Sequence, residues 1–272
     1  MKSEGGFRKQ EFGQFGERAT RPMVTIITVV FNNLTHIEKT ILSVLNQTFK
    51  NKEYIIIDGA SSDGTLDLIR KYDSRIDYWQ SEPDKGIYDA MNKGLHLANG
   101  SYVLFLNSGD LLADKEVLSK VFSDPAPDAD IFYGETNLME ESGKILGTRT
   151  DLTTRKLPEK LSWNNMKYGM VVSHQSIFVK RSIAPNYDLN YRCSADIDWV
   201  IEALKRSKKI INSHTVISNY LIGGFSIKHQ KMSWKERFDI YTKHFGFIKS
   251  VFVHVYIVGR SISYKIRGKS NY

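Results

Sequence analysis

The 272-residue sequence predicts an α/β protein built on a mostly parallel, Rossmann-like sheet that is flanked by helices. Between residues 23 and 110, apolar runs of strand length alternate with segments whose apolar residues recur at helical spacing. Such alternation is typical of βαβ units, which place helices on both faces of a parallel sheet. Three of the apolar runs also end in polar residues, and ligands bind at the carboxyl ends of strands in such sheets.

The first strand is expected at residues 23–31, an uninterrupted apolar run rich in β-branched side chains that ends at Asn32 and Asn33. A helix should follow, because Thr35 and Glu38 have the spacing of a capping box. The apolar residues after this box lie on one helical face. The segment therefore predicts a strand, a polar turn and a helix.

A second strand is expected at residues 53–58, where an apolar run ends in a carboxylate, Asp58. Residues 61–65 are rich in Ser, Asp and Gly and should cap a helix that runs to about residue 72. Residues 76–80 form the third short strand. Asp58 thus joins the asparagines at the predicted ligand-binding edge.

The stretch from residue 81 to residue 110 holds the densest group of candidate site residues. Asp84 and Gly100 bracket apolar residues at helical spacing, which indicates a helix with an acid at its start and a glycine past its end. Residues 102–106 then form a buried strand that stops at a polar loop ending in Asp110. Capping and turn formation explain Asp84 and Gly100 as well as ligand binding does. No helix is predicted at Asp110, so its carboxylate is the stronger candidate for binding a ligand.

The second half carries fewer signals. Strands are expected at residues 131–136 and 144–148, and His174 and Gln175 enter another strand. A lone histidine is usually structural or exposed, and contact with substrate is the less common alternative. Residues 223–226 contain two glycines and indicate either a mobile loop or an ordinary turn.

Residues 194–199 open a helix that begins with two acids, Asp196 and Asp198. An acid in a first helical turn is stabilised by the helix dipole, which alone would account for both. Residues two apart point about 200° apart on a helix, so only one of the two can face a crevice. Asp196 is preferred, because Asp198 shares its face with another charged residue, Glu202.

Composition limits the class of protein. A hydrophobic content of 41% is ample for a folded core, and the single Cys193 excludes an intrachain disulfide framework. Residues 1–22 lack the apolar core of a secretory signal and are expected to be a flexible extension. No apolar run approaches the about 20 residues of a spanning helix, so a cytosolic protein is expected.

The net charge of +8 is concentrated in the C-terminal tail. Residues 228–272 hold ten Lys or Arg and two acids, so the rest of the chain is neutral. The tail predicts a basic amphipathic helix that binds an anionic membrane surface, or alternatively one that packs on the catalytic domain. Because the charge is confined to this tail and no recognition motif accompanies it, nucleic acid is not an expected partner.

Four segments carry a resemblance to a known family: MVTIITVVFN, EYIIIDGASSDGT, SEPDKGIYDAMNKG and FLNSGD. In this order and spacing they resemble the nucleotide-sugar half of inverting family 2 glycosyltransferases with the GT-A fold. The likeness is closest to bacterial enzymes that build exopolysaccharide, colanic acid or O-antigen. It covers about residues 23–230, which divide into a nucleotide-sugar half at 23–110 and an acceptor half at 111–230. The basic helical tail at 231–272 lies outside it.

The resemblance implies a role for each candidate. It assigns donor binding to the ends of the strands and the loops after them, namely Val30, Phe31, Asp58, Asp84, Lys85, Asn92, Asn107 and Ser108. It assigns a catalytic Mg²⁺ or Mn²⁺ to Asp110, the general base to Asp196, and acceptor contacts to His174, Gln175 and Trp199. The donor would be a UDP-sugar and the acceptor a lipid-linked saccharide at the cytoplasmic face of the inner membrane.

The sequence departs from the family pattern at three places. Val29 replaces the usual proline before the first aromatic, and Met91 replaces an arginine beside Asn92, a charge that Lys85 can supply. The metal loop, often D-x-D, keeps only one carboxylate, that of Asp110. A cation that binds through few protein groups still suits such a loop. Because the loop has lost a carboxylate, a non-catalytic sugar-nucleotide-binding protein is the alternative to an enzyme. A nucleotidyltransferase is disfavoured because no glycine-rich phosphate loop is present.

Overall fold

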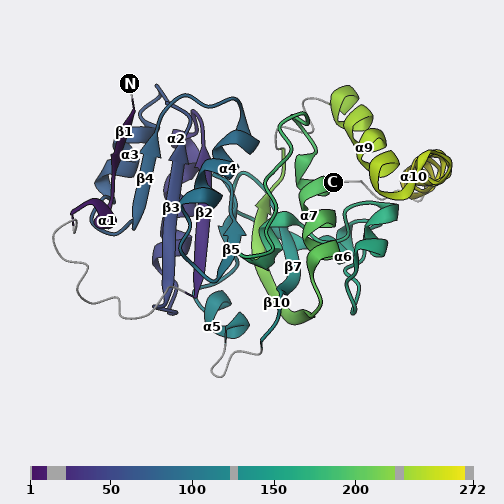
Figure 1. The fold of residues 1–272 in the computed structure, drawn as a ribbon, viewed down its shortest axis with the longest axis horizontal. Helices are drawn as coiled ribbons and strands as arrows, with labels where there is room; N and C mark the ends of the chain where they lie inside the picture. The colour runs from purple at the N-terminus through teal and green to yellow at the C-terminus, as the bar shows by residue number, and fades with distance from the viewer. Residues whose placement is uncertain (1, 11–22, 123–127, 224–229, 267–272) are drawn as a thin grey trace.

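The computed structural model describes residues 2–10, 23–122, 128–223 and 230–266 (Figure 1). The strands of these residues form one mixed sheet in the order β1-β4-β3-β2-β5-β9-β7-β10-β6, with β8 beside β7. The strands are β1 (Ser3–Gly5), β2 (Val24–Val30), β3 (Lys52–Asp58), β4 (Tyr78–Ser81), β5 (Tyr102–Phe105), β6 (Leu111–Leu112), β7 (Ile131–Met139), β8 (Ile145–Thr148), β9 (Ile177–Lys180) and β10 (Ile210–Leu221). The α-helices are α1 (Phe7–Gln10), α2 (Leu34–Leu45), α3 (Thr65–Lys71), α4 (Ile87–Leu97), α5 (Val117–Val121), α6 (Arg149–Leu152), α7 (Ala195–Arg206), α9 (Gln230–Phe245) and α10 (Phe247–Ile266). Two 3₁₀-helices, η1 (Trp163–Tyr168) and η2 (His174–Ser176), complete the described elements.

The predicted parallel sheet is confirmed in the N-terminal half. Strands β4, β3, β2 and β5 are adjacent and parallel, with Ile27 opposite Ile55 on one side and Phe105 on the other. The second half is mixed, because β9 enters antiparallel between β5 and β7. The carboxyl ends of β2, β3 and β5 therefore meet at one edge of the sheet.

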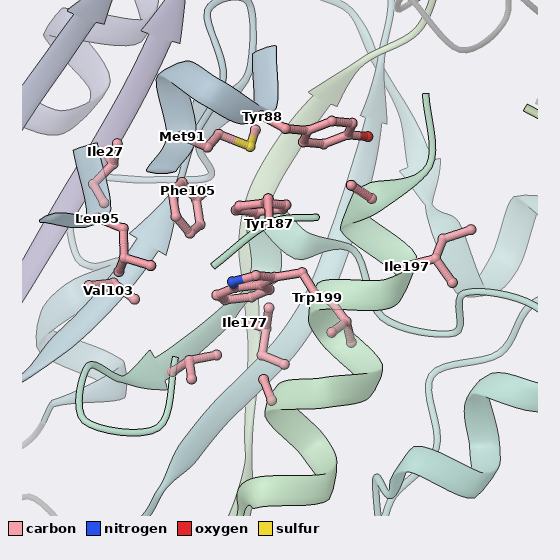
Figure 2. Close-up of a cluster of buried hydrophobic side chains, with 14 of the residues drawn as sticks. Ile27, Tyr88, Met91, Leu95, Val103, Phe105, Ile177, Tyr187, Ile197 and Trp199 are labelled. Atoms are coloured by element: carbon pink, nitrogen blue, oxygen red, sulfur yellow. The ribbon is translucent and has the colours of Figure 1, made fainter. Parts of the chain in front are cut away.

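Helices cover both faces of this sheet because alternate strand residues point to opposite sides. Ile26 and Ile56 pack with buried residues of α2, α3 and α5. Ile27 and Ile57 point the other way, into a cluster that includes residues of α4 and α7 (Figure 2). Gly94 of α4 allows the close approach, since a Cβ there would lie 2.4 Å from a methyl carbon of Ile27.

Several local predictions are corrected. The expected flexible extension begins with an ordered segment, since β1 pairs with β4 and Gly6 donates a backbone hydrogen bond to Asp73; the rest of it, residues 11–22, lies outside the described residues. Helix α2 begins at Leu34 rather than after a Thr35 capping box, because Asp63 accepts the Leu34 N–H from across the loop. Strand β10 was not predicted, since its polar residues hide the strand pattern and only residues 217–219 are buried.

The C-terminal tail is a pair of helices at one end of the molecule (Figure 1). Helix α9 is fixed to α7, because the Asp198 carboxylate accepts hydrogen bonds from Lys243 and lies 2.7 Å from His244 Nε2. Helix α10 turns Ser250, His254 and Ile257 inward and leaves an apolar side exposed, which consists of Phe247, Ile248, Val251, Phe252, Val255 and Val258. Among the described residues, no helix has the length and apolar character that crossing a bilayer requires.

Candidate active site

Hydrogen bonds join the loops that follow β2, β3 and β5. The Asn33 side chain donates to Ser108 Oγ at 2.9 Å, and the Asn32 side chain accepts from Ser62 N–H at 2.8 Å. Asn32 itself has a positive φ of 47°, a conformation that asparagine tolerates better than most residues. The three loops thus form one polar surface at the carboxyl edge of the sheet.

Asp58 lies beneath this surface rather than on it. The residue is only 1% exposed, and its carboxylate accepts hydrogen bonds from the hydroxyls of Ser61 and Ser81. These bonds hold the loop after β3 against the end of β4. Asp58 therefore positions the loop where the resemblance expects the nucleotide base, and its carboxylate is already engaged in the protein.

Asp84 and Phe31 lie together at the mouth of the same edge. A Cβ on Gly59 would come within 2.5 Å of an Asp84 carboxylate oxygen and 3.2 Å of the Phe31 ring, so a larger residue would displace the Asp84 carboxylate. Phe31 is 64% exposed and offers a ring face, whereas Val30 is buried. Burial raises the pKa of Asp84, and the Gly86 N–H that it accepts offsets part of this increase. Lys85 is exposed beside it.

Asp110 is buried at the end of the loop that follows β5. Its carboxylate accepts hydrogen bonds from Gln175 Nε2 at 2.9 Å and from Leu221 N–H at 3.0 Å. Burial raises its pKa to about 6, although these two donors lower it. Gln175 thus holds Asp110 in place, so the structure assigns it a positioning contact instead of the expected contact with the acceptor.

Asp196 lies on the other side of His174 from Asn107. His174 Nδ1 is 3.5 Å from Asp196 Oδ2, and His174 Nε2 is 3.2 Å from Asn107 Nδ2. The Tyr88 hydroxyl, which sequence reasoning missed, is 3.4 Å from Asp196 Oδ1. Burial raises the pKa of Asp196, but hydrogen bonding and the charge of His174 leave it below the usual value. Asp196 is therefore ionised at neutral pH and able to accept a proton.

The structure distinguishes Asp196 from Asp198. The side chain of Asp196 is 20% exposed, whereas that of Asp198 is 6% exposed and bound by Lys243 and His244. The geometry agrees with the prediction that one of the two acids faces the crevice. Only Asp196 is open to a substrate.

Two predicted site residues are structural. Trp199 is 1% exposed, donates its indole N–H to the Pro185 carbonyl and stacks on Tyr187 at an interplanar angle of 8° (Figure 2). Its expected acceptor contact is wrong, because helix α7 turns it into the core. Asn92 uses both ends of its amide on the backbone of Tyr187 and so orders that segment instead of reaching a donor.

Asp196 also lines a pocket that no motif indicated. Its other walls come from α9, α10 and the loops around η1, and they carry Arg155, Arg237 and Arg260. These arginines are far apart in the sequence and belong to no recognisable pattern. Only the fold brings them together.

The residues around Asp110 fit a divalent cation held by few protein groups. The described residues contain no cluster of three His, Cys, Asp or Glu side chains with metal-binding geometry. However, Asn107 Oδ1 is buried without a hydrogen-bond partner among the described residues, and Asp110 ends the same loop. Carboxylate and amide oxygens are hard ligands that suit Mg²⁺ or Mn²⁺ when phosphate oxygens complete the coordination.

Comparisons with known proteins agree with this geometry. The family model for glycosyl transferase family 2 matches residues 25–184. A Bacillus subtilis protein, the putative teichuronic acid biosynthesis glycosyltransferase TuaG, is 29% identical over 220 residues, which cover 79% of this chain and 84% of that protein.

Two solved structures are also similar. Staphylococcus aureus TarS 1–349 in complex with UDP-GlcNAc superimposes with a TM-score of 0.65 at 17% identity and covers 89% of this chain and 73% of its own. A mannosyltransferase of Pyrobaculum calidifontis in complex with GDP-Man and Mn²⁺ has a TM-score of 0.57 at 14% identity, covering 89% and 76%.

Fold and site together define a nucleotide-sugar-type transferase with the GT-A fold. The chain belongs to glycosyltransferase family 2, as the resemblance implied, and is a transferase enzyme. The TuaG relative is named as a putative teichuronic acid biosynthesis enzyme, and the two solved structures are complexes with nucleotide sugars.

Proposed function

We propose that the enzyme transfers a sugar from a UDP-sugar to a hydroxyl of a growing, lipid-linked bacterial polysaccharide, with inversion at the anomeric carbon. One observation carries this proposal: the ionised Asp196 and the Asp110 loop are linked through His174 and Asn107. A base and a diphosphate-binding loop on opposite sides of one sugar are what single-step displacement requires.

Asp196 performs the proton transfer. Its carboxylate accepts the proton of the acceptor hydroxyl as the acceptor oxygen bonds to the anomeric carbon, while the bond from that carbon to the diphosphate oxygen breaks. The products are the glycosylated acceptor, protonated Asp196 and UDP. His174 and Tyr88 hold the Asp196 carboxylate in position, since each has a polar atom within 3.5 Å of it.

Asp110 and Asn107 would hold the divalent cation that the family implies, together with the donor diphosphate. When bound, Mg²⁺ or Mn²⁺ supplies Lewis-acid stabilisation of the charge that develops on the leaving diphosphate. Gln175 keeps the Asp110 carboxylate oriented for this task. The UDP-GlcNAc bound to the structural neighbour TarS supports a UDP-sugar donor, and the naming of TuaG as a putative teichuronic acid biosynthesis glycosyltransferase supports a cell-envelope acceptor.

We also propose that the enzyme lies on the cytoplasmic face of the inner membrane, and the exposed apolar side of α10 supports binding to a membrane surface. Phe252 is 71% exposed, Val255 67% and Ile248 72%, on the same side of α10. Burying this side in a bilayer interface removes apolar surface from water, and the basic residues of the tail favour anionic headgroups. The packing of α9 and α10 on the domain is compatible with this, because it uses the opposite side of α10.

A donor screen tests the proposed function. UDP-, GDP- and dTDP-sugars are offered with and without Mn²⁺, and slow hydrolysis and transfer are followed by nucleotide release, with NMR of the product anomer. The proposal expects UDP release that depends on Mn²⁺ and a product of inverted configuration. Donor binding without any release would favour a non-catalytic binding protein, and a retained configuration would refute the single displacement.

A further inference from the structure

The pocket beside Asp196 is strongly cationic. Arg155 comes from the loop after α6, Arg237 from α9 and Arg260 from α10, and all three residues line it. Of the described residues that line the pocket, Asp196 alone carries a carboxylate, so the three arginines exceed it by two positive charges. Gly169 brings two of the arginines together, since a Cβ there would lie 3.4 Å from Arg155 Nε and 3.7 Å from Arg260 Nη2.

The protein does not neutralise these arginines within its described residues. The Nε atoms of Arg237 and Arg260 are buried without a hydrogen-bond partner there, and Arg260 Nη2 donates only to the Tyr168 carbonyl. Burial and the neighbouring arginines lower the pKa of Arg155 to about 10. Crowding like charges in a partly buried site costs free energy that an anionic ligand would recover.

The nearby acids are already used elsewhere. Glu236 accepts hydrogen bonds from the backbone N–H groups of Arg192 and Cys193, and Asp198 is bound by Lys243 and His244. Neither is available to pair with the pocket arginines. The cluster is therefore not one side of an internal ion-pair network.

The same helix that closes the pocket carries the exposed apolar surface. Arg260 and Ile257 of α10 line the pocket, whereas Phe252, Val255 and Val258 point to solvent. A ligand with an anionic group and a long apolar chain can place the first in the pocket and the second along α10. A free anion or an acidic glycan would use only the pocket.

We propose that this pocket binds the diphosphate of a lipid-linked sugar, so that the acceptor is a sugar 1-diphosphate ester of a polyprenol type of lipid. The inference rests on the proposed transferase function and specifies its acceptor. Because Asp196 is itself part of the pocket wall, the attacking hydroxyl belongs to the sugar that carries the diphosphate. The enzyme therefore adds a sugar directly to the lipid-linked first residue, after a reaction that transfers a sugar 1-phosphate to a lipid phosphate.

Equilibrium binding tests the pocket independently of catalysis. Farnesyl diphosphate is titrated calorimetrically into the full-length protein in two series: in EDTA, so that no metal bridges the ligand, and in Mn²⁺ with saturating UDP, so that the donor site is filled. We expect binding at least tenfold tighter than that of farnesol, and a loss of at least tenfold in Arg155→Gln and in Arg260→Gln. Arg206→Gln, which removes an exposed arginine at the far end of α7 from Asp196, should bind as the unaltered protein does.

Each other outcome overturns the proposal. Farnesol binding as well as the diphosphate, or arginine variants that bind normally while folded by circular dichroism, would remove the pocket from acceptor recognition. Inorganic pyrophosphate binding as tightly as farnesyl diphosphate would refute a lipid ligand, and tighter binding of a glucuronic-acid oligosaccharide would show an acidic glycan instead. Failure of the transferase function is distinguished separately, because it would appear as absent UDP release in the donor screen.

Discussion

Asp196 and Asp198 offer a matched test, because they lie two residues apart on α7 and face different surroundings. Asp196→Asn keeps the shape of the side chain but removes its capacity to accept a proton. The expected loss in kcat is about 10²- to 10⁴-fold, the usual contribution of a positioned general base. Donor affinity should be unchanged, since the contacts described for the Asp196 carboxylate are with Tyr88 and His174, outside the loops after β2, β3 and β5.

Asp198→Asn should have the opposite effects. It weakens the contacts of this carboxylate with Lys243 and His244. The Lys243 side chain is 44% exposed, so its ion pair contributes less to stability than the contact with the buried His244. A cost of about 1–3 kcal/mol is expected, which corresponds to a decrease in Tm of roughly 2–10 °C in a chain of this size. Well below that Tm, kcat should stay within about twofold of the unaltered enzyme.

The pH dependence separates the two further. Burial raises the pKa of Asp198, but hydrogen bonds from His244 and Lys243 leave it below the usual value. Its stabilising effect is therefore complete above the unfolded pKa of about 3.9 and is lost as pH falls toward the lower folded pKa. The Tm difference between the enzyme and Asp198→Asn should shrink below about pH 4. Calorimetric melting and steady-state kinetics measure these effects, and an Asp196→Asn variant with more than half of the original kcat would refute the assignment of the base.

Three further outcomes are expected. Asp110→Asn should abolish Mn²⁺-stimulated turnover. The Mn²⁺ affinity of the unaltered enzyme should weaken as pH falls through about 6, because a proton then competes for the Asp110 carboxylate. Full turnover in EDTA would contradict a metal role for Asp110. Trp199→Ala should lower the free energy of unfolding in urea by about 3–5 kcal/mol, and unchanged stability would contradict its burial in the core. The double variant Phe252→Glu, Val255→Glu should no longer co-sediment with anionic liposomes. The control Leu189→Glu, at an exposed site outside the tail, should co-sediment as the unaltered protein does. Co-sedimentation of the double variant would count against the interfacial helix.

Local pattern was enough to predict the nucleotide-sugar half of the fold. The strands there are continuous apolar runs, and each lies within two residues of its expected position because a fully buried parallel strand has no polar alternation to obscure it. Strand β10 was missed for the opposite reason. Most of its residues are half-buried with no alternation, only residues 217–219 are buried, and register shifts interrupt its pairing with β7.

The candidate site residues also divide into those that the local sequence pattern predicted and those that it did not. Asp110 and Asp196 lie in turns and at a helix start, where sequence pattern indicates a polar residue at a defined place. The roles of Asn92 and Trp199 depend on contacts with residues 187 and 185, which lie far along the chain or across a loop. No periodicity shows which way such a side chain turns. For the same reason the sequence did not indicate Arg155, Arg237 and Arg260 as one pocket.

Helix α9 makes the arginine pocket a fixed part of the catalytic domain. Its Glu236 accepts two backbone N–H groups just before α7, and its Lys243 and His244 hold Asp198 within α7, so α9 is tied to α7 at two points on either side of Arg237. The guanidinium of Arg237 is thereby held beside Asp196. Glu236→Gln leaves one of the two N–H groups without a good acceptor, at a cost of about 1–3 kcal/mol, and loosens one of the two ties. If the contacts between α9 and α7 position the pocket, this variant should raise KM for a prenyl-diphosphate-linked acceptor while kcat and UDP affinity change little. An equal loss of UDP affinity would instead mean that α9 supports the whole domain.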